Sequence, residues 1–241
     1  MGGERVRGVN FRDPAFVGSV PFGAIFVSQS DCGNEDYYGG TYTVPLPPRT
    51  QEGDLLVLFG SGRGGADRTL TDASGWTRHY YADVNSETTY TLQTRRRGAS
   101  EPPLYTWEFS GNIRGRFRIV AVRPSVTPPV PNEDRWANSA TPTFGDAASY
   151  DAPSVTAGTN TLLACMVALS RGSSPNPDGD ALPPAGMVSL GALRNVSGGS
   201  FHSQVVGVEV VAAGVVGVRS FGTPVNTTTV RMALSVAPDA A

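Results

Sequence analysis

Asp54-Leu55-Leu56-Val57-Leu58-Phe59 is the stretch that decides the fold, because it is a continuous apolar run bounded by Gly53 and Gly60. A run of this length between glycines predicts a central β-strand that is covered on both faces. The same kind of run recurs as Thr161-Leu162-Leu163-Ala164-Cys165-Met166-Val167-Ala168-Leu169. The two runs predict a sizeable core built from sheets.

Shorter strands surround these runs. Tyr90–Thr94 and Tyr105–Phe109 alternate between apolar and polar residues, which predicts strands with one buried face. The chain has 29 glycines and 19 prolines but only 17% charged residues, a balance typical of many short strands joined by tight turns. The sequence therefore predicts an all-β fold of the β-sandwich or jelly-roll kind.

The chain reads as two related halves. A proline-rich segment, 124–134, divides it, and matched features recur at offsets of 107 residues (Leu55 and Leu162), 111 (Gly75 and Gly186) and 113 (Ile119 and Met232). Near-constant offsets indicate an internal duplication, although short apolar matches also arise by chance in a β-rich chain.

The predicted organisation has three parts. Residues 1–21, rich in Gly, Arg and Pro, form an extended N-terminal arm, residues 22–126 the first β-sandwich repeat and residues 127–241 the second. The sequence leaves open whether the halves pack as one sandwich or as two. We expect residues 60–65 to be a flexible connection and residues 205–218 to be a pair of buried strands, since the latter are too short for a spanning helix.

Composition argues against nucleic-acid and membrane partners. The 19 basic residues, all arginine, and 21 acidic residues give a net charge of −2, without the positive excess that a phosphate backbone attracts. We interpret Arg95–Arg97 as a solvated turn. The N-terminus lacks the apolar stretch of a signal peptide, so secretory export is not expected.

The sequence shows no catalytic or metal-binding constellation. His79 and His202 lie outside known motifs and are expected to be surface or internally bonded residues. The cysteines and histidines lack the clustered spacing of a zinc site, and we interpret 176–180 as a polar turn in preference to a calcium loop. Glu108 and Glu209 are the only acids within clear strands, which disfavours a glycoside hydrolase. We therefore predict no enzyme, no cofactor and no metal.

Four tyrosines are the candidate contact residues. Tyr37 and Tyr38 lie in a loop, while Tyr80 and Tyr81 are adjacent on a predicted strand. Neighbouring residues of a strand face opposite ways, so the four rings cannot all point inward. They are candidates for contact with a glycan or a protein partner.

The order of five short motifs resembles a known group of proteins. These motifs are Gly53-Asp54-Leu55-Leu56-Val57, Ser74-Gly75-Trp76-Thr77, Tyr90-Thr91-Leu92, Tyr105-Thr106-Trp107-Glu108-Phe109-Ser110 and Ile119-Val120-Ala121-Val122-Arg123. Together they resemble β-sandwich proteins encoded among the structural genes of tailed bacteriophages. The resemblance covers residues 50–124 well and the second half more loosely, since Met187 replaces the tryptophan there.

The resemblance implies a structural protein of the virion, assembled in the cytoplasm of the bacterial host. We expect an accessory protein that decorates the capsid or forms a head or tail appendage. Its partners would be other virion proteins, capsid or tail subunits, and further copies of itself. The alternative is a tail-associated adhesin that binds a host receptor or surface glycan. Head or tail location and copy number stay open.

The two cysteines give a first test of these assignments. Cys165 lies within a predicted central strand and should be inaccessible, whereas Cys32 lies in a polar loop beside Gly33. We expect a thiol reagent to modify Cys32 before Cys165 in the folded protein, as mass spectrometry of a labelling time course will reveal. Equal rates without denaturant would contradict the central-strand assignment.

Overall fold

A computed structural model describes residues 26–32, 39–64, 68–84, 88–123, 136–138, 143–145, 148–157, 161–171, 179–197, 200–223 and 229–236. Every regular element in these residues is a β-strand, so this part of the chain holds no helix that could span a membrane. The predicted all-β fold is confirmed. The proposed arm, 1–21, and the boundary after residue 126 lie outside the described residues.

The first half is a sheet that folds over itself. Its path is β1-β7-β3-β6-β5, and β2 and β4 also pair with β7. The 19-residue β7 belongs to both layers, because its first part pairs with β2 and β4 and its second part with β3 and β1. The strands are β1 (Phe26–Asp31), β2 (Gly39–Pro45), β3 (Leu55–Gly64), β4 (Leu70–Thr71), β5 (Thr77–Val84), β6 (Thr88–Arg96) and β7 (Leu104–Val122).

The second half has one large sheet and two small ones. The large sheet runs β13-β14-β12-β17-β8, with β9 also paired to β17, and the small sheets are β10-β16 and β11-β15. The strands are β8 (Trp136–Asn138), β9 (Thr143–Gly145), β10 (Ser149–Ala152), β11 (Val155–Ala157), β12 (Thr161–Arg171), β13 (Val188–Ser197), β14 (Ser200–Val211), β15 (Gly214–Val216), β16 (Arg219–Gly222) and β17 (Thr229–Val236).

The two large sheets share one topology. The order β5-β6-β3-β7-β1 of the first half matches β13-β14-β12-β17-β8 of the second, strand for strand. The sequence offsets join the same pairs, since Leu55 and Leu162 lie at the starts of β3 and β12, as their first and second residues, and Ile119 and Met232 lie in β7 and β17.

A matching turn precedes β5 and β13. Gly75 and Gly186 both adopt positive φ, 78° and 98°, a region that favours glycine. In each turn the next residue donates its backbone N–H to a carbonyl three residues back: Trp76 to Ala73 at 3.3 Å and Met187 to Pro184 at 3.1 Å. Both side chains are buried, so Met187 occupies the place of the tryptophan.

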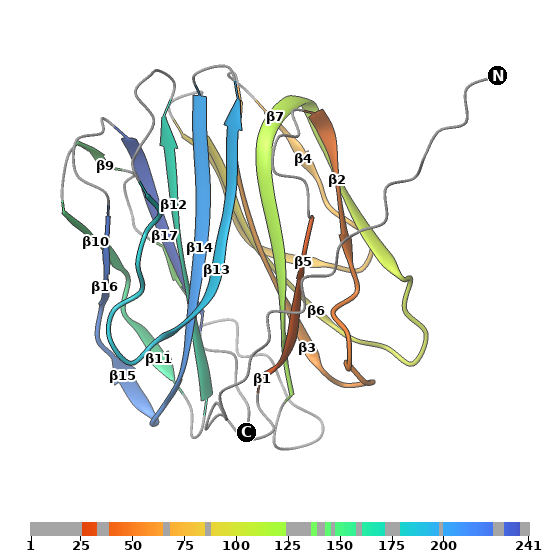
Figure 1. The fold of residues 1–241 in the computed structure, drawn as a ribbon. Helices are drawn as coiled ribbons and strands as arrows, with labels where there is room; N and C mark the ends of the chain where they lie inside the picture. Colours follow the sequence, from red (N-terminus) through yellow and green to blue (C-terminus); the bar gives the residue numbers. More distant parts are fainter. Residues whose placement is uncertain are drawn as a thin grey trace.

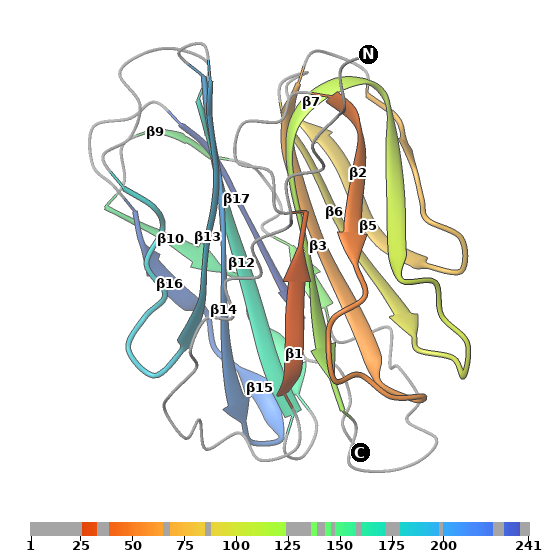
Figure 2. The same cartoon turned by 45° about the vertical axis from the view of Figure 1, so that its right-hand side comes forward.

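The layers enclose three cores (Figures 1 and 2). The large sheets face each other across a middle core, and each half closes an outer core with its smaller layer. Along β3, Val57 points into the middle core and Leu56 into the first outer core, and along β12, Met166 and Cys165 alternate in the same way. Both faces of the two strands are therefore buried, which explains their continuous apolar runs.

The cysteines lie in different environments. Cys165 is fully buried in the outer core of the second half, whereas Cys32 is partly buried against the outer core of the first. They are not joined in a disulfide.

Two expectations about strands were wrong. The glycine-rich segment is not a flexible connection, because β3 continues to Gly64. A Cβ on Gly60 would lie 2.8 Å from the Phe117 ring, and one on Gly62 would lie 2.5 Å from Ile113 Cδ1, so these glycines let β3 approach the side chains of β7. The stretch 205–218 is not buried throughout, since Val216 is buried but its neighbour Val215 is 81% exposed.

This close approach predicts a cost for a single methyl group. Gly62→Ala should lower the free energy of unfolding by about 1–3 kcal/mol, the usual range for overpacking a core. Gly217→Ala is the matched control, because a Cβ added there would have no other atom within 4 Å. Denaturant unfolding of both variants measures the difference, and equal stability would contradict the packing argument.

Candidate functional site

The junction between the two inner sheets changes from apolar to polar along its length. Leu55, Val57 and Phe59 point from β3 into the middle core, and Ser61 continues the same face toward the second half. On β7 the inward positions change from Val120 to charged side chains. The polar end is buried too, and its most enclosed side chains are Ser61, Arg116, Arg118, Ser170, His202 and Gln204.

His202 lies at the centre of this polar end, with no exposed surface. Its Nε2 is 2.9 Å from Ser61 Oγ in the first half, and its Nδ1 is 2.6 Å from Ser170 Oγ in the second. Ser170 is the cross-strand partner of His202 in the β12–β14 pair. One side chain thus joins hydroxyls that belong to the two halves.

Gln204 adds a second link across the junction. Its Nε2 lies 3.2 Å from the Phe59 carbonyl, 3.0 Å from Ser61 Oγ and 3.1 Å from the Arg116 carbonyl. All three acceptors belong to the first half, while Gln204 lies on β14. A buried amide must find such partners, because an unsatisfied polar group costs about 1–3 kcal/mol.

Long polar side chains of the first half also reach carbonyls of β13. Gln29 Nε2 donates to the Leu190 carbonyl at 3.1 Å, and Arg118 Nη1 donates to the Gly191 carbonyl at 2.9 Å. The pairing of β13 with β14 is irregular between Ser189 and Ala192. Side chains of β1 and β7 thus satisfy carbonyls at this irregularity.

Arg116 makes the corresponding contact farther along β13. Its Nε donates to the Arg194 carbonyl at 2.9 Å, and its Nη2 donates to the same oxygen. The docking of the halves is therefore fixed by directional hydrogen bonds as well as by the apolar middle core.

The imidazole of His202 is uncharged and enclosed, and these two properties limit what the cluster can do chemically. Burial, and the positive charges of Arg116 and Arg63, lower the pKa of His202 from 6.5 to about 3. A serine hydroxyl beside an imidazole resembles the start of a catalytic triad, but a triad needs a carboxylate on the second ring nitrogen. Here that nitrogen meets Ser170, and each of the three side chains is at most 1% exposed. A substrate has no access to this arrangement.

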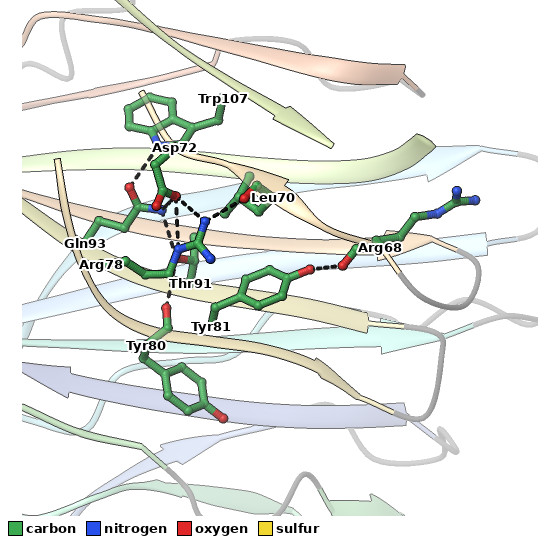
Figure 3. A network of polar contacts seen from close by, with 9 residues as sticks. All are labelled: Arg68, Leu70, Asp72, Arg78, Tyr80, Tyr81, Thr91, Gln93 and Trp107. Atoms are coloured by element: carbon green, nitrogen blue, oxygen red, sulfur yellow. Dashed lines mark hydrogen bonds and ion pairs between the residues drawn. The ribbon is translucent and has the colours of Figure 1, made fainter. Parts of the chain in front are cut away.

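The predicted tyrosine site is not a common surface. Tyr80 packs against the middle core and Tyr81 against the outer core of the first half, so their rings lie on opposite faces of β5. Figure 3 shows the two rings pointing apart. Burial raises the pKa of both phenols, that of Tyr81 to about 12, and the Tyr81 hydroxyl donates to the Arg68 carbonyl. Tyr37 and Tyr38 lie outside the described residues.

A chain of polar contacts leads from the outer core of the first half to β5 (Figure 3). The buried Trp107 indole N–H donates to Gln93 Oε1 at 3.0 Å, and Gln93 Nε2 donates to Asp72 Oδ1 at 2.6 Å. Asp72 also pairs with Arg78 at 2.7 Å, and the Arg78 guanidinium lies over the Tyr81 ring at 5.2 Å. These groups all contact one another, which is typical of a network that stabilises the fold.

The other charged candidates are also used inside the fold. In the arginine run, Arg95 pairs with Glu101 at 2.8 Å and Arg96 donates to the Gly53 carbonyl at 3.0 Å. Glu209 pairs with Arg219 at 2.5 Å, whereas Glu108 is exposed.

The polar turn at 176–180 is described only from residue 179. Asp180 pairs with Arg194 at 2.7 Å and accepts a hydrogen bond from the Ser203 hydroxyl, also at 2.7 Å. Among the residues with described positions, no group of three or more metal-ligating side chains is found.

The sequence did not single out the buried polar end of the junction. Arg114, Arg116 and Arg118 alternate with apolar residues, a pattern that ordinarily predicts a solvated face. The face is covered because the second half packs over it, which a local pattern does not reveal. The alternation itself was the available signal, since it put the three arginines on one face.

Comparisons with protein-family models, curated proteins and solved structures find no match.

The Trp107 network predicts a stability effect without an exposed site. Gln93→Leu should cost about 1–3 kcal/mol, because it leaves the buried indole N–H without its acceptor. Thr106→Val is the control on the exposed face of β7, where the hydroxyl meets Thr43 at 3.2 Å. It should change stability by less than about 0.5 kcal/mol. Chemical denaturation followed by tryptophan fluorescence compares the two, and equal effects would refute the network's role.

Proposed function

We propose that this protein is a non-enzymatic structural component of a bacteriophage particle, an accessory protein that decorates the capsid or forms a head or tail appendage. The main support for the proposal is the location of the reactive side chains. His202 and its serine neighbours are enclosed between the two halves, and they hold the halves together. Reactive side chains that are used to hold the fold together are what we expect of a structural protein.

The motifs that resemble phage proteins have structural roles in this chain, which supports the same conclusion. The first motif opens β3, which is buried on both faces, and Asp54 within it accepts hydrogen bonds from Arg123 in the last motif at 3.0 and 3.1 Å. The second motif contains the tight turn at Gly75 and the buried Trp76. The resemblance thus concerns how the fold is held together.

The surface of the second half supports a role in contacts with other proteins. Val215 and Val218 are 81% and 53% exposed, and residues 210–218 contain no charged side chain. A stretch that exposes two valines without a neighbouring charge is a candidate for contact with another protein. The proposal therefore includes contacts with capsid or tail subunits or with further copies of the chain, in the virion.

The adhesin alternative has less support from the described residues. A sugar-stacking platform needs flat rings that are exposed side by side, whereas Tyr80 and Tyr81 are half-buried on opposite faces of β5. We therefore propose the structural role first.

Deleting residues 1–21 tests the proposal, with those residues acting as the anchor to a partner subunit. The truncated chain should keep its cooperative unfolding, because it retains all the residues described in the three cores. It should fail to enter particles when it replaces the full chain in phage-producing cells. Immunoblots of gradient-purified particles measure incorporation.

A variant of unchanged length refines this test. Replacing Phe11 and Phe16 by serine removes two apolar anchors of the arm and should reduce incorporation, whereas replacing Arg5 and Arg7 by glutamine should not. Normal incorporation of the truncated chain refutes the anchoring role. Absence of the full-length chain from purified particles refutes the virion role itself.

A further inference from the structure

His202 is positioned to sense whether the two halves are in contact. Its ring is held by Ser61 Oγ of the first half at 2.9 Å and by Ser170 Oγ of its own half at 2.6 Å. The cross-strand partner of His202 on β13 is Asn195, which is also buried. When the halves are closed, the ring has no contact with solvent.

The groups that face this ring disfavour a positive charge on it. From β3 and β7, Arg63 and Arg116 act on the imidazole as cations. The hydroxyls of Ser61 and Ser170 are neutral, and so is Gln204 on the same strand. Asp180 contacts the Ser203 hydroxyl, which lies on the other face of β14. In the described part of the chain, no carboxylate is among the groups that act on His202.

The halves also have separate means of staying folded. The first half closes a core around Trp107 and Phe117, and the second closes one around Phe201 and Phe221. The middle core is the part that needs both halves. An opening at the junction therefore leaves two cores intact.

We propose that the junction is an acid-sensitive latch, in which protonation of His202 stabilises an open arrangement of the two halves while each half keeps its own core. The proton comes from solvent and binds the ring once the junction has opened. An imidazolium cannot return to its closed position between two serines beside two arginines without a large electrostatic cost. The latch does not depend on the proposed role in a virion.

The direction of the pH dependence follows from linkage. Above pH 6.5 the ring is neutral in both states, and the closed state has its full stability. Below pH 6.5 the open state binds a proton that the closed state does not bind until pH about 3. The opening equilibrium should therefore rise about tenfold for each pH unit across this window.

An engineered thiol on the inner face of β12 reports the opening. Ala168 is fully buried in the middle core and pairs with Gln204, while Cys165 on the same strand is buried in the outer core. In a Cys32→Ala background, Ala168→Cys is labelled with a dipyridyl disulfide that reacts at acid pH. Its rate, divided by that of the denatured protein at the same pH, should rise about fifteenfold in all between pH 6.5 and 5. Cys165 should stay unreactive.

The two histidines provide a matched pair of controls. His202→Gln cannot be protonated, so the pH dependence of labelling at position 168 should disappear. His79→Gln, on β5, should leave it unchanged. The latch is refuted if His202→Gln keeps the pH dependence, if His79→Gln removes it, or if position 168 shows none. Parallel labelling of Cys165 would refute it as well, because that result means global unfolding.

A second measurement covers the case in which His202→Gln does not fold. Proton and carbon NMR of histidine-labelled protein shows two ring signals, which the His79→Gln variant assigns. The His202 ring should remain neutral through pH 6, because the open state that binds the proton is a minority there even while the labelling rate of position 168 rises. Titration of His202 near pH 6.5 without labelling would overturn the proposal.

Discussion

Burial of both faces of β3 and β12 is the constraint on which the rest of the structure depends. Each strand needs two covers, and the smaller layer of its own half provides only one of them. The second cover is the inner sheet of the other half, where Val57 and Met166 meet in one cluster. Apolar burial contributes roughly 25 cal/mol per Å², so contact between the two inner faces makes a large contribution to the stability of the closed arrangement.

Apolar burial alone does not fix how two such faces dock, since flat apolar surfaces slide with little change in energy. The polar end of the junction removes this freedom. Gln204, Arg116 and Arg118 each donate to carbonyl oxygens of the opposite half, and a small shift would leave these buried groups unsatisfied. The apolar end therefore provides most of the attraction, and the polar end selects one arrangement.

Local patterns in the sequence were sufficient for the strands and insufficient for their surroundings. The runs from Leu55 and Leu162 predicted central strands because continuous apolar residues need cover on both faces. Arg116 and His202 could not be placed in the same way, because their burial depends on a half that lies far away in the chain. Gly60 was misjudged for the same reason, since its role is set by the Phe117 ring. For the tyrosine site, the only available pattern was that neighbouring residues of a strand face opposite ways, and this does not determine which rings are exposed.

The duplicated topology puts unequal demands on the two copies. The equivalent strands β3 and β12 meet across the junction, yet the hydrogen bonds described there run mainly from β1 and β7 to β13 and from β14 to β3 and β7. A symmetric pair would use each contact twice, whereas a single chain can specialise each half for one side. With Leu55 matched to Leu162, the strand registers make Thr88 and Tyr90 on β6 the counterparts of His202 and Gln204 on β14, so the imidazole and the amide occur in one copy only. The directional contacts, and the histidine that we propose to respond to pH, thus lie in one part of the junction.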